Sequence, residues 1–162
     1  ANKAIIDADA DRYFFVPDAV EVTVANAPEM TAHAPVYPNK PERGERLLHF
    51  TGKVLLPRAE VEKGGMLRLK DLFNIRMTGE ATAEYAGESL AEARKEKAPI
   101  IQWLPAENAA PCSLLTPEGM QDGFAEPEVL GYAGKIVQFE RVGFAKIDAV
   151  ENGKAVAYHT HR

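Results

Sequence analysis

The chain has 162 residues, of which 46% are hydrophobic and 27% are charged, and its formal net charge at pH 7 is −5. This length accommodates one ordinary domain or two small ones that share a core. No apolar run reaches the roughly 18 residues of a membrane-spanning helix, no signal peptide is evident, and the acidic balance taken alone argues against a polyanionic partner.

The N-terminal part predicts two strands and a long loop. Residues 1–11 are expected to finish a helix of a preceding segment, and the missing initiator methionine suits a fragment of a longer protein or equally a processed complete chain. Residues 12–16 are rich in β-prone side chains, and residues 20–24 alternate apolar and polar ones as a half-buried strand does. Four prolines predict a loop over residues 25–45, because each proline pushes the preceding residue away from helical geometry.

The middle of the chain predicts short strands separated by glycine turns. They cover residues 46–50, 53–56, 66–70, 71–77 and 81–86. The second strand either continues the first beyond Gly52 or is its hairpin partner, and Pro57 is expected to open one helical turn that ends at Gly64. In the third strand Arg68 and Lys70 share one face about 7 Å apart, close to the spacing of adjacent phosphates on one nucleic-acid strand.

One helix and further strands complete the pattern. Ser89 and Glu92 form a capping box for a short helix that Pro99 stops. Further predicted elements are strands at 100–104, 112–115, 136–142 and 155–158, a loop at 123–127 and a hairpin turn at 152–153. Trp103 either packs in the core or stacks on a base.

The single cysteine and the C-terminal histidines are weak candidates for chemistry. Cys112 cannot form an internal disulfide, which favours a reducing, cytoplasmic setting, and its apolar flanks predict a buried strand start and not a nucleophile. His159 and His161 have a spacing that can bind a metal, but no third ligand is evident. The sequence therefore predicts no metal site.

The segment 134–148 carries side chains suited to reading a base. In an extended strand Gln138 and Arg141 fall on opposite faces, so a bulge or bend near Gly143 is needed to bring them together. An amide that donates and accepts, beside a guanidinium fork, can read the Watson–Crick edge of an unstacked base. The alternative is a barrel strand with an ordinary Glu140–Arg141 pair and an edge glutamine.

Basic residues gather in two stretches despite the negative net charge. They are Lys63, Arg68, Lys70 and Arg76, followed by Lys135, Arg141 and Lys146. Such clustering can form a local phosphate-binding face. It favours a specific nucleic-acid partner over a protein that coats nucleic acid nonspecifically. On charge alone, a solvated surface with chance clustering remains an equal alternative.

Ten or so short strands with one short helix predict an all-β barrel or sandwich. The sequence contains no glycine-rich phosphate loop, no Gly-x-Ser-x-Gly elbow, no Cys-x-x-Cys pair and no His-Glu-x-x-His motif. No catalytic constellation can be assembled, so the chain is expected to bind a partner and not to transform one.

Five motifs follow one another along nearly the whole chain. They are Tyr37–Arg46 (YPNKPERGER), Leu67–Asp71 (LRLKD), Ile100–Trp103 (IIQW), Gly123–Pro127 (GFAEP) and Gln138–Phe144 (QFERVGF). In this order they resemble the C-terminal anticodon-binding region of class I glutamyl- and glutaminyl-tRNA synthetases. The ending Tyr158–Arg162 and the compact loops look more like the archaeal-type glutamyl enzyme than like the glutaminyl branch.

The resemblance implies a fold and a partner. The fold would be all-β, with two small antiparallel β-barrels, proximal and distal to a catalytic body, over residues 1–162. They would grip the anticodon loop of glutamate tRNA, with glutamine isoacceptors as further candidates, and would contact neither membrane nor DNA. The parent enzyme would attach glutamate to tRNA with ATP and Mg²⁺ in a catalytic half that this chain lacks, so the chain itself needs no cofactor.

The resemblance also implies individual contacts. The expected RNA-binding residues are Arg12, Arg68, Lys70, Arg76, Gln138 and Arg141. Arg12 is similar to a family arginine that contacts an anticodon base, and Gln138 and Arg141 match a Gln-x-x-Arg pair that reads the middle uridine. The glutaminyl branch tends to have arginine at position 70, so Lys70 is expected to act as a point charge without bidentate contact.

Two alternatives stay open. The chain is either the corresponding domain of a glutaminyl-tRNA synthetase or a β-barrel that docks proteins without binding RNA. Salt-dependent binding of tRNA would separate the last alternative from the others.

Overall fold

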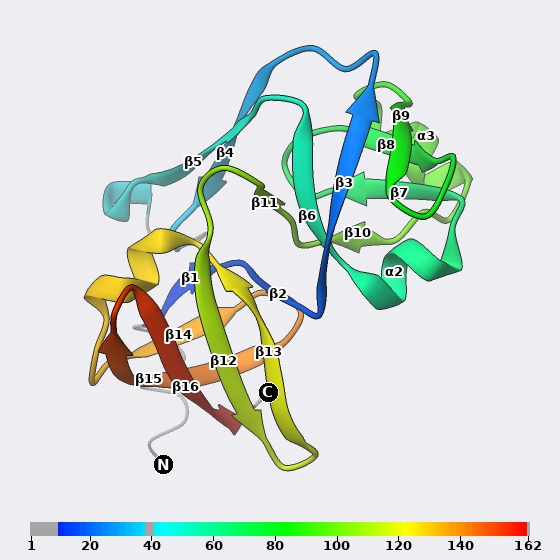
Figure 1. The fold of residues 1–162 in the computed structure, drawn as a ribbon. Coiled ribbons are helices and arrows are strands. Elements are labelled where there is room, and N and C mark those ends of the chain that lie inside the picture. Colours follow the sequence, from blue (N-terminus) through cyan, green and yellow to red (C-terminus); the bar gives the residue numbers. More distant parts are fainter. Residues whose placement is uncertain (1–9, 38–40, 162) are drawn as a thin grey trace.

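The computed structural model describes residues 10–37 and 41–161. They form two curled sheets of seven strands each and a ribbon of two strands. In Figure 1 one sheet lies above the other, with the ribbon at the left. Residues 1–9, where the sequence predicts the end of a helix, lie outside the described residues, as do residues 38–40 of the first motif.

The upper sheet, which we call the first barrel, has the strand order β10-β7-β8-β9-β3-β6-β11. Its elements are β3 (Ala19–Ala25), β6 (Lys53–Pro57), α2 (Arg58–Lys63), β7 (Met66–Leu69), β8 (Asn74–Met77), β9 (Thr82–Tyr85), α3 (Leu90–Lys95), β10 (Ile100–Ile101) and β11 (Leu104–Pro105). Only Gln102 and Trp103 separate the two outermost strands along the chain. The edges of the sheet therefore come together, and the sheet curls into a barrel.

The lower sheet, which we call the second barrel, has the order β1-β14-β15-β16-β12-β13-β2. Its elements are β1 (Asp11–Tyr13), β2 (Phe15–Pro17), β12 (Ala110–Thr116), β13 (Gly119–Ala125), the 3-10 helix η2 (Pro127–Gly131), β14 (Ile136–Phe139), β15 (Gly143–Glu151) and β16 (Lys154–His161). Here the outermost strands, β1 and β2, are separated by Phe14 alone. The edges of this sheet are therefore also adjacent along the chain, and the predicted all-β fold with barrels is confirmed.

The ribbon consists of β4 (Met30–Pro35) and β5 (Glu45–Phe50), joined through the 3-10 helix η1 (Pro41–Arg43). The prediction of a loop throughout residues 25–45 is therefore wrong for β4. Ala32 and Ala34 are buried while His33 between them is exposed, an alternation typical of a strand. Pro35 lies at the end of the strand, where the missing N–H group interrupts little pairing.

Most predicted strands are confirmed, because side-chain alternation sets which face is buried. In β3, Val22 and Val24 point into the first barrel while Glu21 and Thr23 are exposed. The capping box is also confirmed, since the Ser89 hydroxyl accepts a hydrogen bond from the Glu92 N–H group at 3.1 Å and α3 follows. The turn after Pro57 forms a second short helix, α2, beside the single one expected in the fold class.

Three local predictions are wrong because pairing between distant segments decides the structure. Residues 123–127, expected to be a loop, begin within β13, which pairs with both β12 and β2. β6 is neither a continuation nor a partner of β5, because it pairs with β3 and β11. Among the described strands four pairings are parallel, although antiparallel barrels were expected.

Each barrel has its own apolar core, and Trp103 lies in the first. Trp103 is fully buried, and its indole N–H group donates to the backbone carbonyl of Lys70 at 2.9 Å. The core alternative for this residue is therefore confirmed over base stacking. In the second barrel Phe15 and Phe139 pack with ring centroids 5.2 Å apart.

Gly123 marks a close approach between β13 and β2. A Cβ atom at this position would lie 2.0 Å from the carbonyl oxygen of Val16, a backbone atom that cannot move aside alone. We expect Gly123→Ala to lower the free energy of unfolding by about 2–3 kcal/mol, as overpacking does. Denaturant titration measures the loss, with Gly131→Ala as the control because its added methyl group meets nothing within 4 Å. Equal stabilities of the two variants would contradict the account.

Candidate nucleic-acid interface

Arg12 and Gln138 lie side by side on the outside of the second barrel. The parallel pairing of β1 with β14 sets Arg12 opposite Gln138. Their neighbours Val137 and Phe139 are buried in the barrel, so the alternation of the strand directs Gln138 outward. Neither side chain has a hydrogen-bond partner within the described part of the chain, and the Arg12 Nε atom is buried without one. Gln138 is thus free to meet a ligand, whereas Arg12 can offer only its terminal nitrogens, because its Nε atom is buried.

Arg141 leaves the strand at a sharp turn. Its φ of +67° is in the left-handed region, and Val142 N–H donates to the Phe139 carbonyl at 3.0 Å to close the turn before Gly143 opens β15. The bend expected near Gly143 is confirmed. The Arg141 side chain is 41% exposed and donates through Nη1 to the amide oxygen of Gln102 at 2.9 Å. No contact between Gln138 and Arg141 is among those that the structure describes.

A buried ionic network joins the two barrels directly behind this turn. Arg46 Nη2 on β5 lies 2.9 Å from Glu126 Oε2 and 3.0 Å from Glu140 Oε2, and Lys70 at the end of β7 bonds to the other oxygen of Glu140. Arg46, Glu126 and Glu140 are at most 5% exposed. The Phe14 N–H group adds a hydrogen bond of 2.6 Å to Glu126. The cations come from the ribbon and the first barrel, and the carboxylates come from the second.

Arg46 stays charged in spite of burial, whereas burial raises the pKa of Glu126 by more than Arg46 and the Phe14 N–H group lower it. Burial alone would lower the pKa of Arg46, but the attraction of Glu126 and Glu140 outweighs it and raises the pKa above the usual value. Arg46 also lies over the Phe14 ring, 4.8 Å from its centroid, and donates to the Pro35 carbonyl at 2.9 Å. All three of its nitrogens are therefore bonded, and the guanidinium is fixed.

Arg46, Glu126 and Glu140 lie in the sequence motifs, but no role was predicted for Arg46 or Glu126. Arg46 and Glu126 are 80 residues apart, and no local pattern pairs them. The available signal was a charged residue at the start of a strand-forming apolar run, as Arg46 is before Leu47 and Leu48. Such a residue calls for a buried partner, because an isolated charge is costly to bury.

The basic residues of the first barrel also have protein partners. Arg68 and Lys70 alternate with buried Leu67 and Leu69, which agrees with the shared face expected for them. Arg68 donates to the Glu88 carbonyl at 2.8 Å, and burial lowers its pKa.

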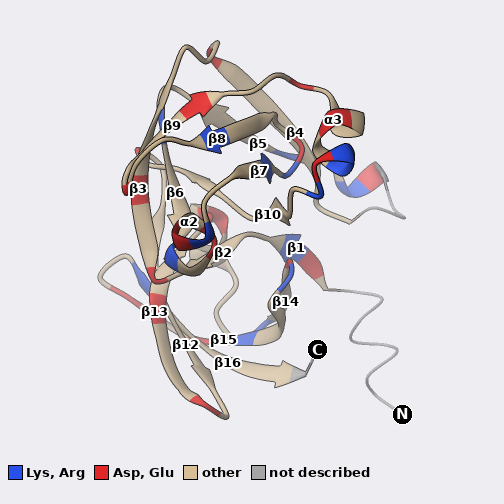
Figure 2. Cartoon of the chain, turned by 90° about the vertical axis from the view of Figure 1, so that its right-hand side faces the viewer, with Lys and Arg blue, Asp and Glu red and all other residues tan. Residues whose placement is uncertain are grey.

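Arg76 forms a bidentate pair with Glu96, at 2.9 and 3.1 Å. Figure 2 shows basic and acidic segments together on α2 and α3, and a basic segment on β8. The roles of Arg68, Lys70 and Arg76 in binding RNA stay predictions.

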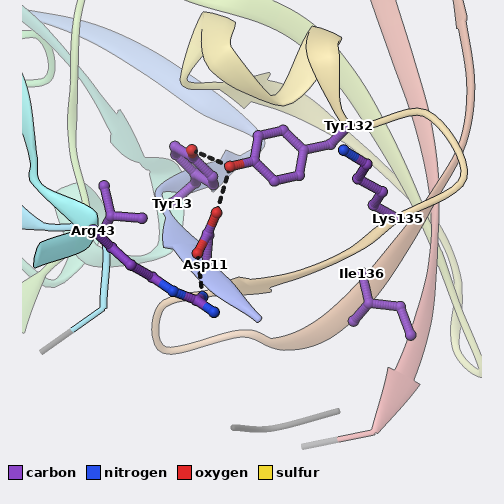
Figure 3. Close-up of a pocket in the computed structure, with 7 residues that line it drawn as sticks. Asp11, Tyr13, Arg43, Tyr132, Lys135 and Ile136 are labelled. Carbon is purple, nitrogen blue, oxygen red and sulfur yellow. Dashed lines mark hydrogen bonds and ion pairs between the residues drawn. The ribbon is translucent and has the colours of Figure 1, made fainter. Parts of the chain in front are cut away.

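A hollow of about 520 Å³ opens at the start of β1 and β14. Figure 3 shows Asp11 between Arg43 and Tyr132. Arg43 Nη1 lies 2.8 Å from Asp11, and the Tyr132 hydroxyl donates to the other carboxylate oxygen at 2.5 Å. Burial and the bond to Asp11 raise the pKa of Tyr132, so the phenol stays protonated. Lys135 lies over the Tyr132 ring at 5.8 Å, so the described charges of this hollow are already engaged.

The remaining candidates for chemistry are structural or lie outside the described residues. Cys112 is 1% exposed, and burial raises its pKa to about 12. No group of three potential metal-ligating side chains exists among the residues that the structure describes, and the side chain of His161 is outside them. Neither described α-helix, at six residues each, is long enough to cross a membrane.

Comparison with known proteins gives consistent matches. Two family models, each described as tRNA synthetases class I (E and Q), anti-codon binding domain, match residues 10–92 and 100–148. The chain is 76% identical over 161 residues to a glutamate–tRNA ligase of Methanocorpusculum labreanum, and 52% identical over 164 residues to one of Methanoculleus marisnigri. It is 40% identical over 173 residues to one of Pyrococcus abyssi.

These alignments cover 99% of the chain but only 29% or 30% of each relative. The chain thus spans less than a third of the length of each of these three relatives.

The buried network generates a prediction about stability. Arg46→Ala leaves the carboxylates of Glu126 and Glu140 without their main counter-charge, and we expect it to lower the free energy of unfolding by about 3–5 kcal/mol. The control is Arg76→Ala, which removes an exposed ion pair and should cost about 0–1 kcal/mol. Urea titration of both variants compares them, and a loss below about 1 kcal/mol for Arg46→Ala would contradict the role assigned to the network.

The burial of Cys112 generates a second prediction. With a pKa of about 12 and almost no exposed surface, the thiol should not react with a thiol-specific reagent in the folded protein at pH 8. It should react promptly once the chain is unfolded in guanidinium chloride, because a free thiol has a pKa of about 8.5. The absorbance of the product released from the reagent reports the reaction. Rapid labelling of the folded protein would show that Cys112 on β12 is not buried as described.

Proposed function

Since the chain belongs to the family of anticodon-binding domains of class I tRNA synthetases for glutamate and glutamine, we propose that it binds the anticodon loop of tRNA. The observation that carries the proposal is the pair formed by Arg12 and Gln138, which are adjacent, half-buried and without a side-chain hydrogen-bond partner among the described residues. Arg141 adds a partly exposed guanidinium at the next turn of the same chain segment.

The chemistry of these side chains suits unstacked bases. A glutamine amide both donates and accepts hydrogen bonds, and an arginine presents up to five N–H groups in a fixed plane. Sequence-specific recognition of RNA mostly uses such groups against the exposed edges of single-stranded bases. Nearby lysines and arginines neutralise phosphates and make the affinity depend on salt, while the base contacts supply discrimination.

The activity of the parent protein is part of the same proposal. The relatives named above are glutamate–tRNA ligases, and the chain spans 29% or 30% of their length. We propose that the parent attaches glutamate to tRNA in the cytoplasm, using ATP and Mg²⁺ bound in a catalytic part outside this chain. Glutamine tRNA is a second candidate substrate, because the choice depends on how strictly the third anticodon base is read.

A binding titration of the full-length parent protein tests this function. It uses glutamate tRNA and glutamine tRNA at several salt concentrations, and we expect saturable binding that weakens as salt increases. Arg141→Ala should weaken binding of glutamate tRNA by about 1–3 kcal/mol, or about 5- to 150-fold. Lys146→Ala, at an exposed position on β15, is the control and should have a smaller effect.

The outcomes separate the alternatives. Equal, small losses for the two variants would argue against base reading by Arg141. Absence of saturable tRNA binding by the unaltered protein would overturn the proposed function and favour a domain that docks other proteins.

A further inference from the structure

The Arg141 side chain reaches across the boundary between the barrels. Arg141 belongs to the turn after β14 in the second barrel, whereas both of its described side-chain partners belong to the first. Gln102 lies between β10 and β11, and its amide oxygen accepts from Arg141 Nη1 at 2.9 Å. Glu60 lies in α2, and its Oε2 atom is 3.9 Å from Arg141 Nη2.

Gln102 is itself held in one orientation. It is 5% exposed, and its Nε2 group donates to the backbone carbonyl of Phe15 at 3.3 Å. Because a carbonyl can only accept and a guanidinium can only donate, the amide must turn its nitrogen to Phe15 and its oxygen to Arg141. Gln102 therefore offers a fixed acceptor to one edge of the guanidinium.

Glu60 supplies a second, less complete partner. It is 7% exposed, and its Oε1 atom accepts from Lys63 Nζ at 3.0 Å. Its Oε2 atom is buried without any hydrogen-bond donor among the described residues. A buried carboxylate oxygen without a donor is costly, so the charge of Arg141 at 3.9 Å is favoured in that place.

The backbone directs Arg141 toward these partners. Its left-handed conformation is unusual for a residue other than glycine and is costly, so surrounding contacts must maintain it. The preceding residue, Glu140, is fixed by Arg46 and by its own N–H group, which donates to the Tyr13 carbonyl at 3.0 Å. Both the main chain and the side chain of Arg141 are thus positioned.

We infer that Gln102 and Glu60 are positioning residues that orient the Arg141 guanidinium for base reading, so that recognition by the second barrel depends on the first. The inference rests on the proposed function. One N–H group is bonded to Gln102 and one nitrogen faces Glu60, while the side chain is 41% exposed. The remaining N–H groups of the guanidinium are therefore available to donate hydrogen bonds to one base, in a fixed orientation.

The test measures discrimination between anticodons. The full-length parent protein and its variants Gln102→Ala and Glu60→Gln are titrated with glutamate tRNA and with tRNAs changed at each anticodon base in turn. Arg141→Ala first identifies the base whose recognition depends on Arg141. We expect both positioning variants to reduce the preference for that same base at least fivefold, with less than twofold change for the other two. Glu62→Gln, exposed on the same helix, is the control and should change nothing.

Double variants exclude a merely structural effect. In the Arg141→Ala background, adding Gln102→Ala or Glu60→Gln should cause no further loss, because the group they orient is gone. A similar loss in that background, or an unchanged preference in the single variants, would overturn the inference. Glu60→Gln preserves the shape of the side chain, so it decides the question if Gln102→Ala does not fold. Failure of the unaltered protein to prefer any anticodon would instead overturn the proposed function.

Discussion

The ionic network around Arg46 is the constraint on which the arrangement of the two barrels depends. Its guanidinium contacts Glu126 and Glu140 of the second barrel, and Lys70 of the first barrel binds the same Glu140. Charges buried this deeply tolerate few geometries, since each needs its partner in place. Apolar contacts also join the barrels, because Phe14 and Val16 of the second barrel pack in the core of the first, and the shared buried charges fix the geometry of this junction. A stable relation between the barrels is what a binding surface built from both requires.

The same network lies beside the residues proposed to read RNA. Glu140 directly precedes Arg141, and Phe14, whose N–H group binds Glu126, directly follows the strand that carries Arg12. Structural and recognition roles thus alternate along the chain within two short segments. In β14 the alternation is simple, because Phe139 fills the core while Gln138 faces outward. Beyond β14 it is the left-handed turn that separates buried Glu140 from exposed Arg141.

Much of the fold could be predicted from local signals. Alternation located β3 and β7, the Ser89 cap located α3, and the bend near Gly143 followed from the need to turn Arg141. The β4 strand could not be predicted because its alternating side chains are small alanines among prolines, and its pairing with β5 supplies what local preference lacks. In the site, outward-facing Gln138 was predictable, but the partners of Arg141 were not. Gln102 is 39 residues away, and no spacing rule links two barrels across such a distance.

The closure of the second barrel around Phe14 has a consequence for synthesis of the chain. Its first two strands come from residues 11–17, and its other five come from residues 110–161, with the whole first barrel between them. A chain emerging from the ribosome can pair β1 with β14, or β2 with β13, only after more than a hundred residues have been added. Until then both strands have unpaired edges, and the first barrel folds while the second barrel is still incomplete. A product that stops before β14 therefore lacks the strand with which β1 pairs. Its N-terminal strands then have no complete second barrel to join.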